Sequence, residues 1–460
     1  MTDTIAAIAT PPGTGAIGII RLTGPKSRTI AERIFTSSSP CFDDFRPRFL
    51  HHGIVTDESG SFLDDVLIAH LPGPASFSGE DMIEIFAHGG QTVLQTLLER
   101  ILACGARLAD PGEFTKRAFL NGKMDLTQAE AIAELISAPT KAALILASAK
   151  RAGALKDVGE RLRRRLETVL AHLFLAIDFT DDEAECIDMT ATKTEVQSCL
   201  EMIEALERSG RRAYKFREGC LVVIAGQVNV GKSSLMNSIL GRQRAIVTDF
   251  PGTTRDYIEE TIDLEGIPVR LVDTAGFRSA SDKADPVEEF GIHRTQELVS
   301  EADTVVFMYD VHQGMTEEDW GLIESFSQSR PCILAGNKID LMPDLDDTTL
   351  RDRDRGPHIL ISAKFGRNVD TLLDVIRREL DSEKSETLQG TIAPNARQLV
   401  LLGQARIGLD HFLIDLRVGQ PLDILAGHVQ NAVGHLSEIT GRIAPDDVLH
   451  RIFADFCIGK

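Results

Sequence analysis

Residues 226–233 read GQVNVGKS and match G-x-x-x-x-G-K-[ST], the phosphate-binding loop of P-loop proteins. The apolar run CLVVIAG precedes this loop and the helical pattern SLMNSILG follows it, which is the strand-then-helix setting that the motif requires. In that setting backbone N–H groups and the amino end of a helix face the phosphates. Lys232 would bridge the β- and γ-phosphates, and Ser233 would ligate Mg²⁺. The stretch predicts a parallel α/β domain that binds a nucleotide.

Two further motifs follow in the order of a guanine-nucleotide site. DTAG ends the strand-like run IPVRLVD, so Asp273 can join the Mg²⁺ shell and the Gly276 N–H can contact the γ-phosphate. NKID follows the run CILAG, and the Asp340 carboxylate can accept both the N1 and N2 hydrogens of guanine, a contact that adenine cannot make. SAK would close over the base. The predicted GTP-binding residues are Asn229, Val230, Gly231, Lys232, Ser233, Ser234, Thr248, Asp249, Phe250, Pro251, Gly252, Thr253, Thr254, Asp273, Thr274, Ala275, Gly276, Asn337, Lys338, Asp340, Ser362, Ala363 and Lys364.

The catalytic group is less obvious than the binding site. A glutamine often follows the glycine of DTAG and orients the attacking water, but here Phe277 stands in that place and cannot hold a water. Thr254, in TDFPGTTRD, is the natural sensor of Mg²⁺ and the γ-phosphate. Two replacements remain open: a cation near the phosphates, which stabilises the transition state, or a carboxylate of the switch region, which orients or deprotonates water.

The pattern of apolar residues and turn residues along the chain predicts three kinds of domain, one of them inserted into another. Residues 1–120 mix β-rich runs with glycine turns, as in a small α+β domain. Residues 121–217 and 383–460 have helical periodicity, with Thr127 and Glu130 expected as a capping box. Between them, residues 218–382 alternate strand and helix patterns. We expect the two helical segments to pack into one bundle around a Ras-like P-loop domain.

Composition excludes several classes of protein. A net charge of −20 argues against broad binding of a phosphate backbone, so a nucleic-acid substrate needs a local patch or a partner protein. The seven cysteines include no CxxC pair, which argues against a zinc site or a disulfide framework. No apolar run long enough for a membrane span and no basic leader is found, so the cytoplasm is expected.

An acidic cluster in DFTDDEAE offers a further choice. A metal site is one interpretation, and a solvated loop that repels stray phosphates is the one we favour. The cluster comprises Asp178, Asp181, Asp182, Glu183 and Glu185.

Together with PPGTGAIGIIRLTG, PGEFTKRAFLNGK and the terminal FCIGK, the motifs make the whole chain resemble the tRNA-modification GTPase family MnmE, also called TrmE. The resemblance implies that K⁺ supplies the positive charge of an arginine finger, and that dimerisation of two GTPase domains orders the switch loop. It implies K⁺ ligands at Asn229, Thr248, Phe250 and Thr253. It also implies that Ser233 and Thr254 hold Mg²⁺ and that Glu288, in VEEFGIHR, positions the hydrolytic water.

Two departures from the family pattern bear on these residues. Val228 stands in the phosphate loop where the family commonly has proline, a mild loss of rigidity. About three extra residues lie around Lys283–Asp285, so Glu289 and Asp285 are alternatives to Glu288.

The resemblance also implies a tetrahydrofolate derivative, 5-formyl or 5,10-methylene, in an N-terminal domain that forms a homodimer. Its residues would be Arg21, Glu84, Lys123 and Lys460. Glu84 could read the pterin edge as Asp340 reads guanine, and Arg21 and Lys123 suit the anionic tail or polar ring atoms. Without the resemblance, Arg21 reads as a surface charge and Lys123 as a turn residue. Cys457 is either a packed residue or a nucleophile or resolving thiol, and we favour a functional role.

By the same resemblance, GTP turnover serves a one-carbon transfer to C5 of the wobble uridine of certain tRNAs. That step would need an FAD-binding partner protein, since we expect the sequence to lack a G-x-G-x-x-G dinucleotide fingerprint of its own. The alternative function is a regulatory GTPase that binds RNA or the ribosome without modifying it.

Overall fold

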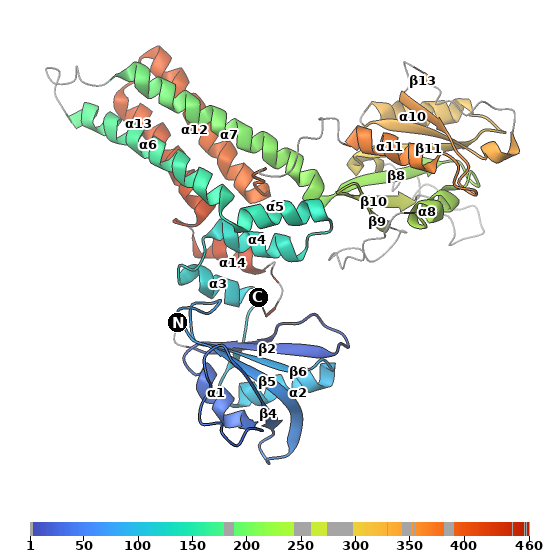
Figure 1. The fold of residues 1–460 in the computed structure, drawn as a ribbon. Coiled ribbons are helices and arrows are strands. Elements are labelled where there is room, and N and C mark those ends of the chain that lie inside the picture. The colour runs from blue at the N-terminus through green and yellow to red at the C-terminus, as the bar shows by residue number, and fades with distance from the viewer. Residues whose placement is uncertain are drawn as a thin grey trace, which may run out of the picture. The chain divides into compact units, whose positions relative to one another are not determined.

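The structure is a computed structural model that describes residues 3–178, 188–242, 259–273, 298–328, 330–342, 351–352, 356–380, 391–443, 445–454, 456 and 458–459 (Figure 1). These residues divide into two compact units. The first unit comprises Met1–Ala133, Lys150–Glu204 and Ala396–Lys460, and the second comprises Glu134–Ala149 and Ala205–Asn395. The second unit therefore interrupts the first twice along the chain.

A seven-stranded sheet begins the first unit, in the order β3-β4-β5-β6-β2-β1-β7. Its strands are β1 (Ile5–Ile8), β2 (Ile17–Thr23), β3 (Phe35–Ser37), β4 (Leu50–Thr56), β5 (Phe62–Leu71), β6 (Met82–His88) and β7 (Arg107–Leu108). Its neighbouring strands pair antiparallel, except that β1 and β7 are parallel. Helices α1 (Ser27–Ile34) and α2 (Gln91–Ala103) pack against this sheet. The region is the expected α+β domain.

Alternation along β6 decides what the two faces of this sheet present. Ile83 and Ile85 are buried in the core with Leu97 and Ile101 of α2. Glu84 therefore points to the opposite face, because successive side chains of a strand alternate. The register places Arg21 of β2 directly beside it.

The expectation that the sequence lacks G-x-G-x-x-G is wrong as a pattern match, because GTGAIG, residues 13–18, fits it letter by letter. It runs into strand β2 and not into a helix, so it lacks the strand-to-helix setting of a dinucleotide site. Gly18 faces Leu94, whose Cδ1 would lie 2.4 Å from an added Cβ. This glycine therefore serves packing between the sheet and α2.

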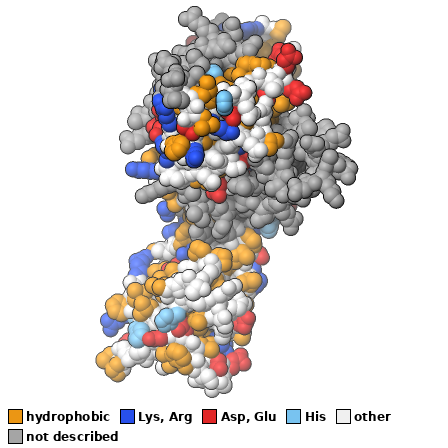
Figure 2. All heavy atoms as spheres, turned by 90° about the vertical axis from the view of Figure 1, so that its right-hand side faces the viewer, with side chains coloured by type: hydrophobic (Ala, Val, Ile, Leu, Met, Phe, Trp, Pro, Cys, Tyr) orange, Lys and Arg blue, Asp and Glu red, His pale blue; other side chains and the backbone are white. Residues whose placement is uncertain are grey.

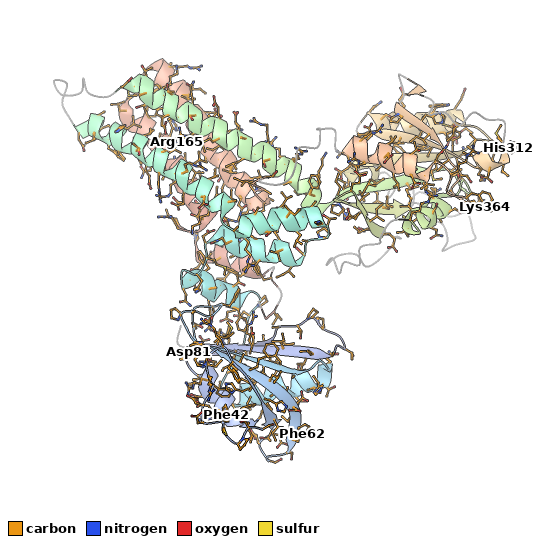
Figure 3. The ribbon with its side chains drawn as sticks, viewed as in Figure 1. Phe42, Phe62, Asp81, Arg165, His312 and Lys364 are labelled. Atoms are coloured by element: carbon orange, nitrogen blue, oxygen red, sulfur yellow. The ribbon has the colours of Figure 1, made fainter. Side chains whose placement is uncertain are left out.

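Helices from both ends of the chain form the rest of the first unit. They are α3 (Glu113–Leu120), α4 (Leu126–Ile136), α6 (Ala154–Asp178), α7 (Met189–Glu218), α12 (Ala396–Val418), α13 (Leu422–Thr440) and α14 (Asp446–Ala454). The part of α4 after Ala133 and the part of α7 after Glu204 belong to the second unit. Helix α13 packs against both α12 and α6. Arg165 of α6, labelled in Figure 3, binds Glu195 of α7, with Nη2 2.9 Å from Oε2. The two helical segments pack together, as the inserted arrangement requires.

The capping box expected at Thr127 and Glu130 is wrong by two residues. Asp125 caps α4: its Oδ1 accepts from the Thr127 N–H at 2.7 Å and from the Gln128 N–H at 3.1 Å. Gln128 returns the bond by accepting from the Asp125 N–H at 3.1 Å. The Glu130 carboxylate instead accepts hydrogen bonds from Arg397 of α12, with Nε 2.7 Å from Oε1 and Nη2 3.0 Å from Oε2. A tertiary ion pair thus binds the carboxylate that the local pattern assigns to the cap.

The second unit contains a second seven-stranded sheet, in the order β13-β14-β12-β11-β8-β10-β9. Its strands are β8 (Cys220–Gly226), β9 (Glu259–Leu264), β10 (Ile267–Asp273), β11 (Thr304–Asp310), β12 (Cys332–Asn337), β13 (Arg351–Asp352) and β14 (Gly356–Leu360). The five from β14 to β10 are parallel, and β9 and β13 add antiparallel edges. Helices α8 (Lys232–Leu240) and α11 (Val369–Leu380) contribute to one hydrophobic cluster and α10 (Glu317–Ser327) to another. This is the expected P-loop α/β architecture.

The second unit reaches further along the chain than the predicted range 218–382. Helix α5 (Lys141–Arg151) and the end of α7 pack onto its sheet, with Ala142, Leu146 and Phe216 in the same hydrophobic cluster as Ile262 and Leu264 of β9. Thr140 Oγ1 donates to Gly266 O, at the tip of the β9–β10 hairpin, at 2.8 Å. Two helical pieces therefore complete the core of the nucleotide-binding unit.

Candidate functional site

The phosphate loop joins the carboxyl end of β8 to the amino end of α8. Gly226, at φ 139°, passes so close to β11 that an added Cβ would lie 2.0 Å from Met308 O. Gly231, at φ 98°, would likewise place a Cβ 2.4 Å from Asn337 Nδ2. Asn229 is also in the left-handed region, at φ 60°. The loop needs glycines at two positions, because backbone or fixed side chains fill the space that a Cβ would take.

Lys232 and Ser233 begin α8 at the mouth of this loop. Lys232 Nζ donates to the carbonyl oxygens of Gly226 and Gln227, at 2.8 Å and 2.7 Å. Ser233 Oγ donates to Asp273 Oδ2 at 2.8 Å. A hydroxyl and a carboxylate held together match the oxygen ligands that Mg²⁺ takes beside bound phosphates. Within the described residues, Ser233 and Asp273 are the pair that would hold the ion, so the residues present fit Mg²⁺.

The base-recognition motifs meet at the carboxyl ends of β12 and β14. Asn337 Nδ2 donates to Val230 O at 2.7 Å, and its Oδ1 accepts from the Ala363 N–H at 2.9 Å. Ser362 Oγ donates to Asp340 Oδ1 at 2.6 Å. One amide side chain thus ties the phosphate loop to the base loop. Lys364 and His312, which follow β14 and β11, lie at this same end of the sheet (Figure 3).

Two carboxylates that the sequence analysis missed support this site. Asp310, buried at the end of β11, binds Lys338 Nζ with its Oδ2 at 2.7 Å and accepts from the His312 N–H at 2.9 Å. Burial opposes ionisation of Asp310, but Lys338 and the His312 N–H outweigh it and lower the pKa of the carboxyl. Asp319 of α10 accepts a hydrogen bond from the Gln227 side chain of the phosphate loop. Asp310 could have been predicted from the sequence, because it ends the apolar run TVVFMYD at the carboxyl end of a buried strand, where the other site residues lie.

Part of the predicted nucleotide site lies outside the described residues. This part comprises Thr248, Asp249, Phe250, Pro251, Gly252, Thr253, Thr254, Thr274, Ala275, Gly276 and Glu288, with the alternatives Asp285 and Glu289. Of the four predicted K⁺ ligands, Asn229 is the one that is described. Ser234, next to Ser233, is exposed on the first turn of α8.

The predicted folate residues are brought together only in part. Arg21 donates to Glu84 Oε1 from Nε at 2.9 Å and from Nη2 at 2.8 Å. The guanidinium lies over the rings of Phe77 and Phe114, with Cζ 5.5 Å and 5.8 Å from the centroids. Lys123 Nζ donates elsewhere, to Pro74 O at 2.9 Å, and so fixes a neighbouring loop. Arg21 and Glu84 form a paired site, and Lys123 supports a loop.

The C-terminal tail is seated against this site. Gly459 O accepts from Arg21 Nη1 at 3.4 Å, and an added Cβ on Gly459 would lie 2.4 Å from Ile8 O. Before it, Phe456 is buried with Phe453 and Leu449 of α14. Cys457 and Lys460 lie outside the described residues, so their predicted roles stay predictions.

A buried ion cluster next to this site was also missed. Arg117 of α3 is fully buried and binds Glu80 at 3.0 Å, Asp3 at 2.9 Å and Glu113 at 3.0 Å. Arg107 binds Asp3 at 2.8 Å and Glu113 at 2.7 Å. Glu113 lies four residues before Arg117 on the same helix, but Asp3 and Glu80 come from distant parts of the sequence, so no local spacing predicts that they join the cluster. The cluster fixes α3 against the loop that carries Phe77.

No helix among the described residues is long and apolar enough to cross a membrane. In the same part of the chain, no group of three or more His, Cys, Asp or Glu residues is placed to hold a metal ion. The acidic cluster is described only at Asp178, and its other members lie beyond the described ranges.

Comparisons with known proteins cover the whole chain. The family described as "GTP-binding protein TrmE N-terminus" matches residues 4–123, and the "MnmE helical domain" family matches residues 126–457. A tRNA modification GTPase MnmE of Lawsonia intracellularis is 43% identical over 463 residues, covering 100% of both chains. The protein of the same name from Nitratidesulfovibrio vulgaris (strain DP4) is 44% identical over 460 residues, covering 100% of this chain and 99% of its own. That of Acetivibrio thermocellus is 39% identical over 464 residues, again covering 100% and 99%. With a phosphate loop and base motifs folded as a GTPase requires, the chain belongs to the tRNA modification GTPase MnmE family.

Proposed function

We propose that this chain uses GTP hydrolysis to drive a conformational cycle that serves tRNA modification. In that cycle a one-carbon unit from a tetrahydrofolate derivative, 5-formyl or 5,10-methylene, is placed on C5 of the wobble uridine of certain tRNAs. An FAD-binding partner protein supplies the flavin and forms a hetero-oligomer with this chain. The cytoplasm is the compartment in which these substrates meet.

The observation that carries this proposal is the seating of the tail at Arg21. Gly459 O lies 3.4 Å from Arg21 Nη1, and this contact between the end of the chain and a predicted folate residue supports the proposal. A GTPase that only bound RNA or the ribosome would not need a tail seated on a polar site of its N-terminal domain. Cys457 lies two residues before Gly459 in the sequence, and Lys460 follows it directly. We therefore propose that these two residues complete the folate site.

On the nucleotide side we propose that Lys232 and the amino end of α8 hold the phosphates of GTP. Asp340 reads guanine, and Ser233 with Thr254 holds Mg²⁺. The hydrogen bonds of Asn337 to Val230 and Ala363 support this assignment, since they fix the phosphate loop and the base loop relative to each other.

We further propose that K⁺ replaces the missing polar group of DTAGFR. Asn229, with Thr248, Phe250 and Thr253, would ligate the ion, and Glu288 or a neighbouring acid would position the water. The left-handed backbone of Asn229 supports this, because such conformations in non-glycine residues are uncommon and cluster at functional sites. Positive charge beside the phosphates stabilises the transition state as an arginine finger does.

We propose that the N-terminal domain forms a homodimer. Four large apolar side chains of its β4–β5 region are exposed: Phe49 by 55%, Leu50 by 51%, Phe62 by 62% and Leu67 by 37%. Figure 2 shows hydrophobic side chains over much of this domain, in the lower part of the view, with charged and histidine side chains between them. Apolar area of this kind is typical of a protein interface.

The test is a deletion strain rescued with the wild-type chain, Asp273→Ala or Cys457→Ser, followed by mass spectrometry of tRNA wobble uridines. We expect the C5 modification to disappear on deletion and to return only with the wild type. An unchanged wobble position in the deletion strain would sink the modifying role and favour a regulatory RNA- or ribosome-binding GTPase.

A further inference from the structure

The base loop, residues 362–367, turns its tip toward solvent. Two backbone hydrogen bonds between Ser362 and Arg367 close the loop, at 3.0 Å and 3.1 Å. At the tip, Lys364, labelled in Figure 3, is exposed, and Phe365 is exposed by 68%. A segment with little buried apolar surface opens at low cost. Contacts from other elements therefore decide how firmly this loop is held.

One of these contacts comes from Arg242, which lies just after the end of α8. Its Nη2 donates to Gly366 O at 2.7 Å, and its Nη1 binds Asp370 in the first turn of α11. Gly366 has φ 72°, and an added Cβ would lie 2.2 Å from Arg242 Nη2. Because residue 366 has no side chain, the guanidinium can pack directly on the backbone of the loop.

The two ends of the turn in this loop are thus bound by different elements. At its start, the Ala363 N–H donates to Asn337, the last residue of β12, at 2.9 Å. At its end, Gly366 O accepts from Arg242. An arginine suits the second position, because its planar fork of donors can bind a carbonyl oxygen and a carboxylate at the same time. A lysine in its place would bind with a single ammonium group.

The two bonds of Arg242 differ in what they contribute. Asp370 is exposed by 75%, and an ion pair with such a carboxylate contributes little in water. The bond to Gly366 O is partly buried and has a charged donor, so it contributes more. Through this bond, the segment that begins with Lys232 at the phosphate loop also reaches the base loop. Helix α8 covers the distance with nine residues, roughly 13 Å at about 1.5 Å per residue.

We propose that Arg242 is a positioning residue for guanine recognition, which acts through Gly366 to hold the base loop against the base. This inference rests on the proposed function, in which SAK closes over guanine and Asp340 reads its N1 and N2 hydrogens. Without Arg242 the loop opens more often, so GDP and GTP leave faster, while the contacts of Lys232 with the phosphates stay intact. The KM for GTP should then rise and kcat should stay unchanged, as for the loss of an interaction made equally in the ground state and the transition state.

Dissociation of fluorescent GDP from the full-length protein is the first measurement. We expect Arg242→Ala to release it roughly tenfold faster, the loss expected for one hydrogen bond to a charged group. Arg242→Lys, which keeps the charge, should have a rate between those of the wild type and Arg242→Ala. Asp370→Asn leaves the bond to Gly366 in place and should change the rate by about twofold at most.

Arg377→Ala is the matched control and should keep the wild-type rate. The Arg377 side chain is exposed by 35%, as is that of Arg242, and it binds Glu265 at 2.7 Å from the last turn of α11. The control therefore removes an equally exposed arginine and its ion pair from the same unit without touching the base loop.

Competition with nucleotide analogues shows whether Arg242 acts through the base. The 6-thio analogue of GDP replaces the guanine oxygen by sulfur, a weak acceptor, and keeps both hydrogens that Asp340 accepts. Inosine diphosphate keeps the oxygen and lacks the 2-amino group. We expect the affinity lost on going from GDP to the 6-thio analogue to be smaller in Arg242→Ala than in the wild type. The affinity lost with inosine diphosphate should be the same in both proteins.

Three results would contradict these expectations. Equal losses with the 6-thio analogue in the wild type and in Arg242→Ala, or losses that shrink alike for both analogues, would overturn the role of Arg242 at the base. A dissociation rate of Arg242→Ala equal to that of Arg377→Ala would overturn it as well. Wild-type protein that binds GDP and both analogues equally would instead refute the reading of guanine, and this inference with it.

Discussion

The nucleotide site and the tail-covered site around Arg21 are held in opposite ways. In the nucleotide site, Asn337, Asp310 and Asp319 bind other protein groups and thereby fix the phosphate loop, Lys338 and Gln227. In the other site, the two predicted ligand-reading groups, Arg21 and Glu84, bind each other, and Gly459 O adds to Arg21. The first site is preorganised for its ligand. The second is closed on itself, so a ligand must join or displace contacts that the chain already makes.

The base end of the preorganised site should give the largest effect. Asp340→Asn keeps an oxygen for the Ser362 hydroxyl but loses the carboxylate that accepts two guanine hydrogens. We expect GTP affinity to fall roughly 10³- to 10⁴-fold, because a site built to pair with a polar edge rejects a mismatch strongly. Titration with fluorescent GTP and XTP measures it, and XTP should gain affinity. An unchanged ratio of the two affinities would show that Asp340 does not read the base.

The phosphate end should come next. Lys232→Ala removes the cation at the start of α8, and we expect GTP hydrolysis to fall roughly 10²- to 10³-fold, as for the loss of other transition-state donors. Phosphate release measures the rate. Lys123→Ala, which removes the lysine bound to Pro74 O in the N-terminal domain, is the control and should leave hydrolysis unchanged. A loss smaller than tenfold for Lys232→Ala would contradict its predicted role.

A change at the contact between Gly459 and Arg21 should affect folate binding but not GTP binding. Gly459→Ala would put a Cβ 2.4 Å from Ile8 O on a residue at φ 93°, so the tail should leave its seat. We expect roughly tenfold weaker binding of 5-formyltetrahydrofolate by calorimetry, an effect of about 1.4 kcal/mol, with GTP affinity unchanged. Gly60→Ala is the matched control, because Gly60 has φ 83° but no atom within 4 Å of the added Cβ. Equal folate binding by both variants would show that the seated tail does not build the site.

The last prediction concerns pH and the ion cluster of Arg107, Arg117 and Glu113. Burial alone would raise the pKa of the Glu113 carboxyl, but hydrogen bonds from Arg107, the Asp110 N–H and Arg117 outweigh it and lower the pKa. A carboxyl with a lowered folded-state pKa stabilises the fold above its unfolded pKa and loses that contribution as pH falls through the folded value. We expect Glu113→Gln to cost about 1–3 kcal/mol near neutral pH and less in acid, measured by urea unfolding. A cost independent of pH would refute the assignment.

Local motifs were the part of the molecule that could be predicted from sequence. GQVNVGKS, NKID and SAK lie where a parallel sheet ends, and their hydrogen bonds run as the motifs require. These short stretches suffice because their geometry is set by the turn in which they lie. Arg21 and Glu84 also pair as placed, although only the family resemblance, and no pattern in the residues, singled them out.

The unpredicted parts depend on contacts between distant residues. Glu130 does not form the expected capping box, because its carboxylate binds Arg397, which is 267 residues away in the sequence. Arg117 gathers Asp3 and Glu80, which no helical or strand period relates. The share of α5 in the nucleotide-binding unit was missed for the same reason, since its alternation of small and apolar residues does not say which core it enters.

The bond from Thr140 to Gly266 has a consequence for synthesis of the chain. Its two residues are 126 positions apart, so α5 emerges from the ribosome long before the β9–β10 hairpin to which it is bound. At about 5–20 residues per second the wait is roughly 6–25 seconds. During that time Ala142 and Leu146 have no sheet to cover, so their apolar side chains stay without the core that they join in the folded protein. A gene fragment that starts at β8 would have the opposite defect. It would encode the whole sheet but not α5, whose Ala142 and Leu146 cover it.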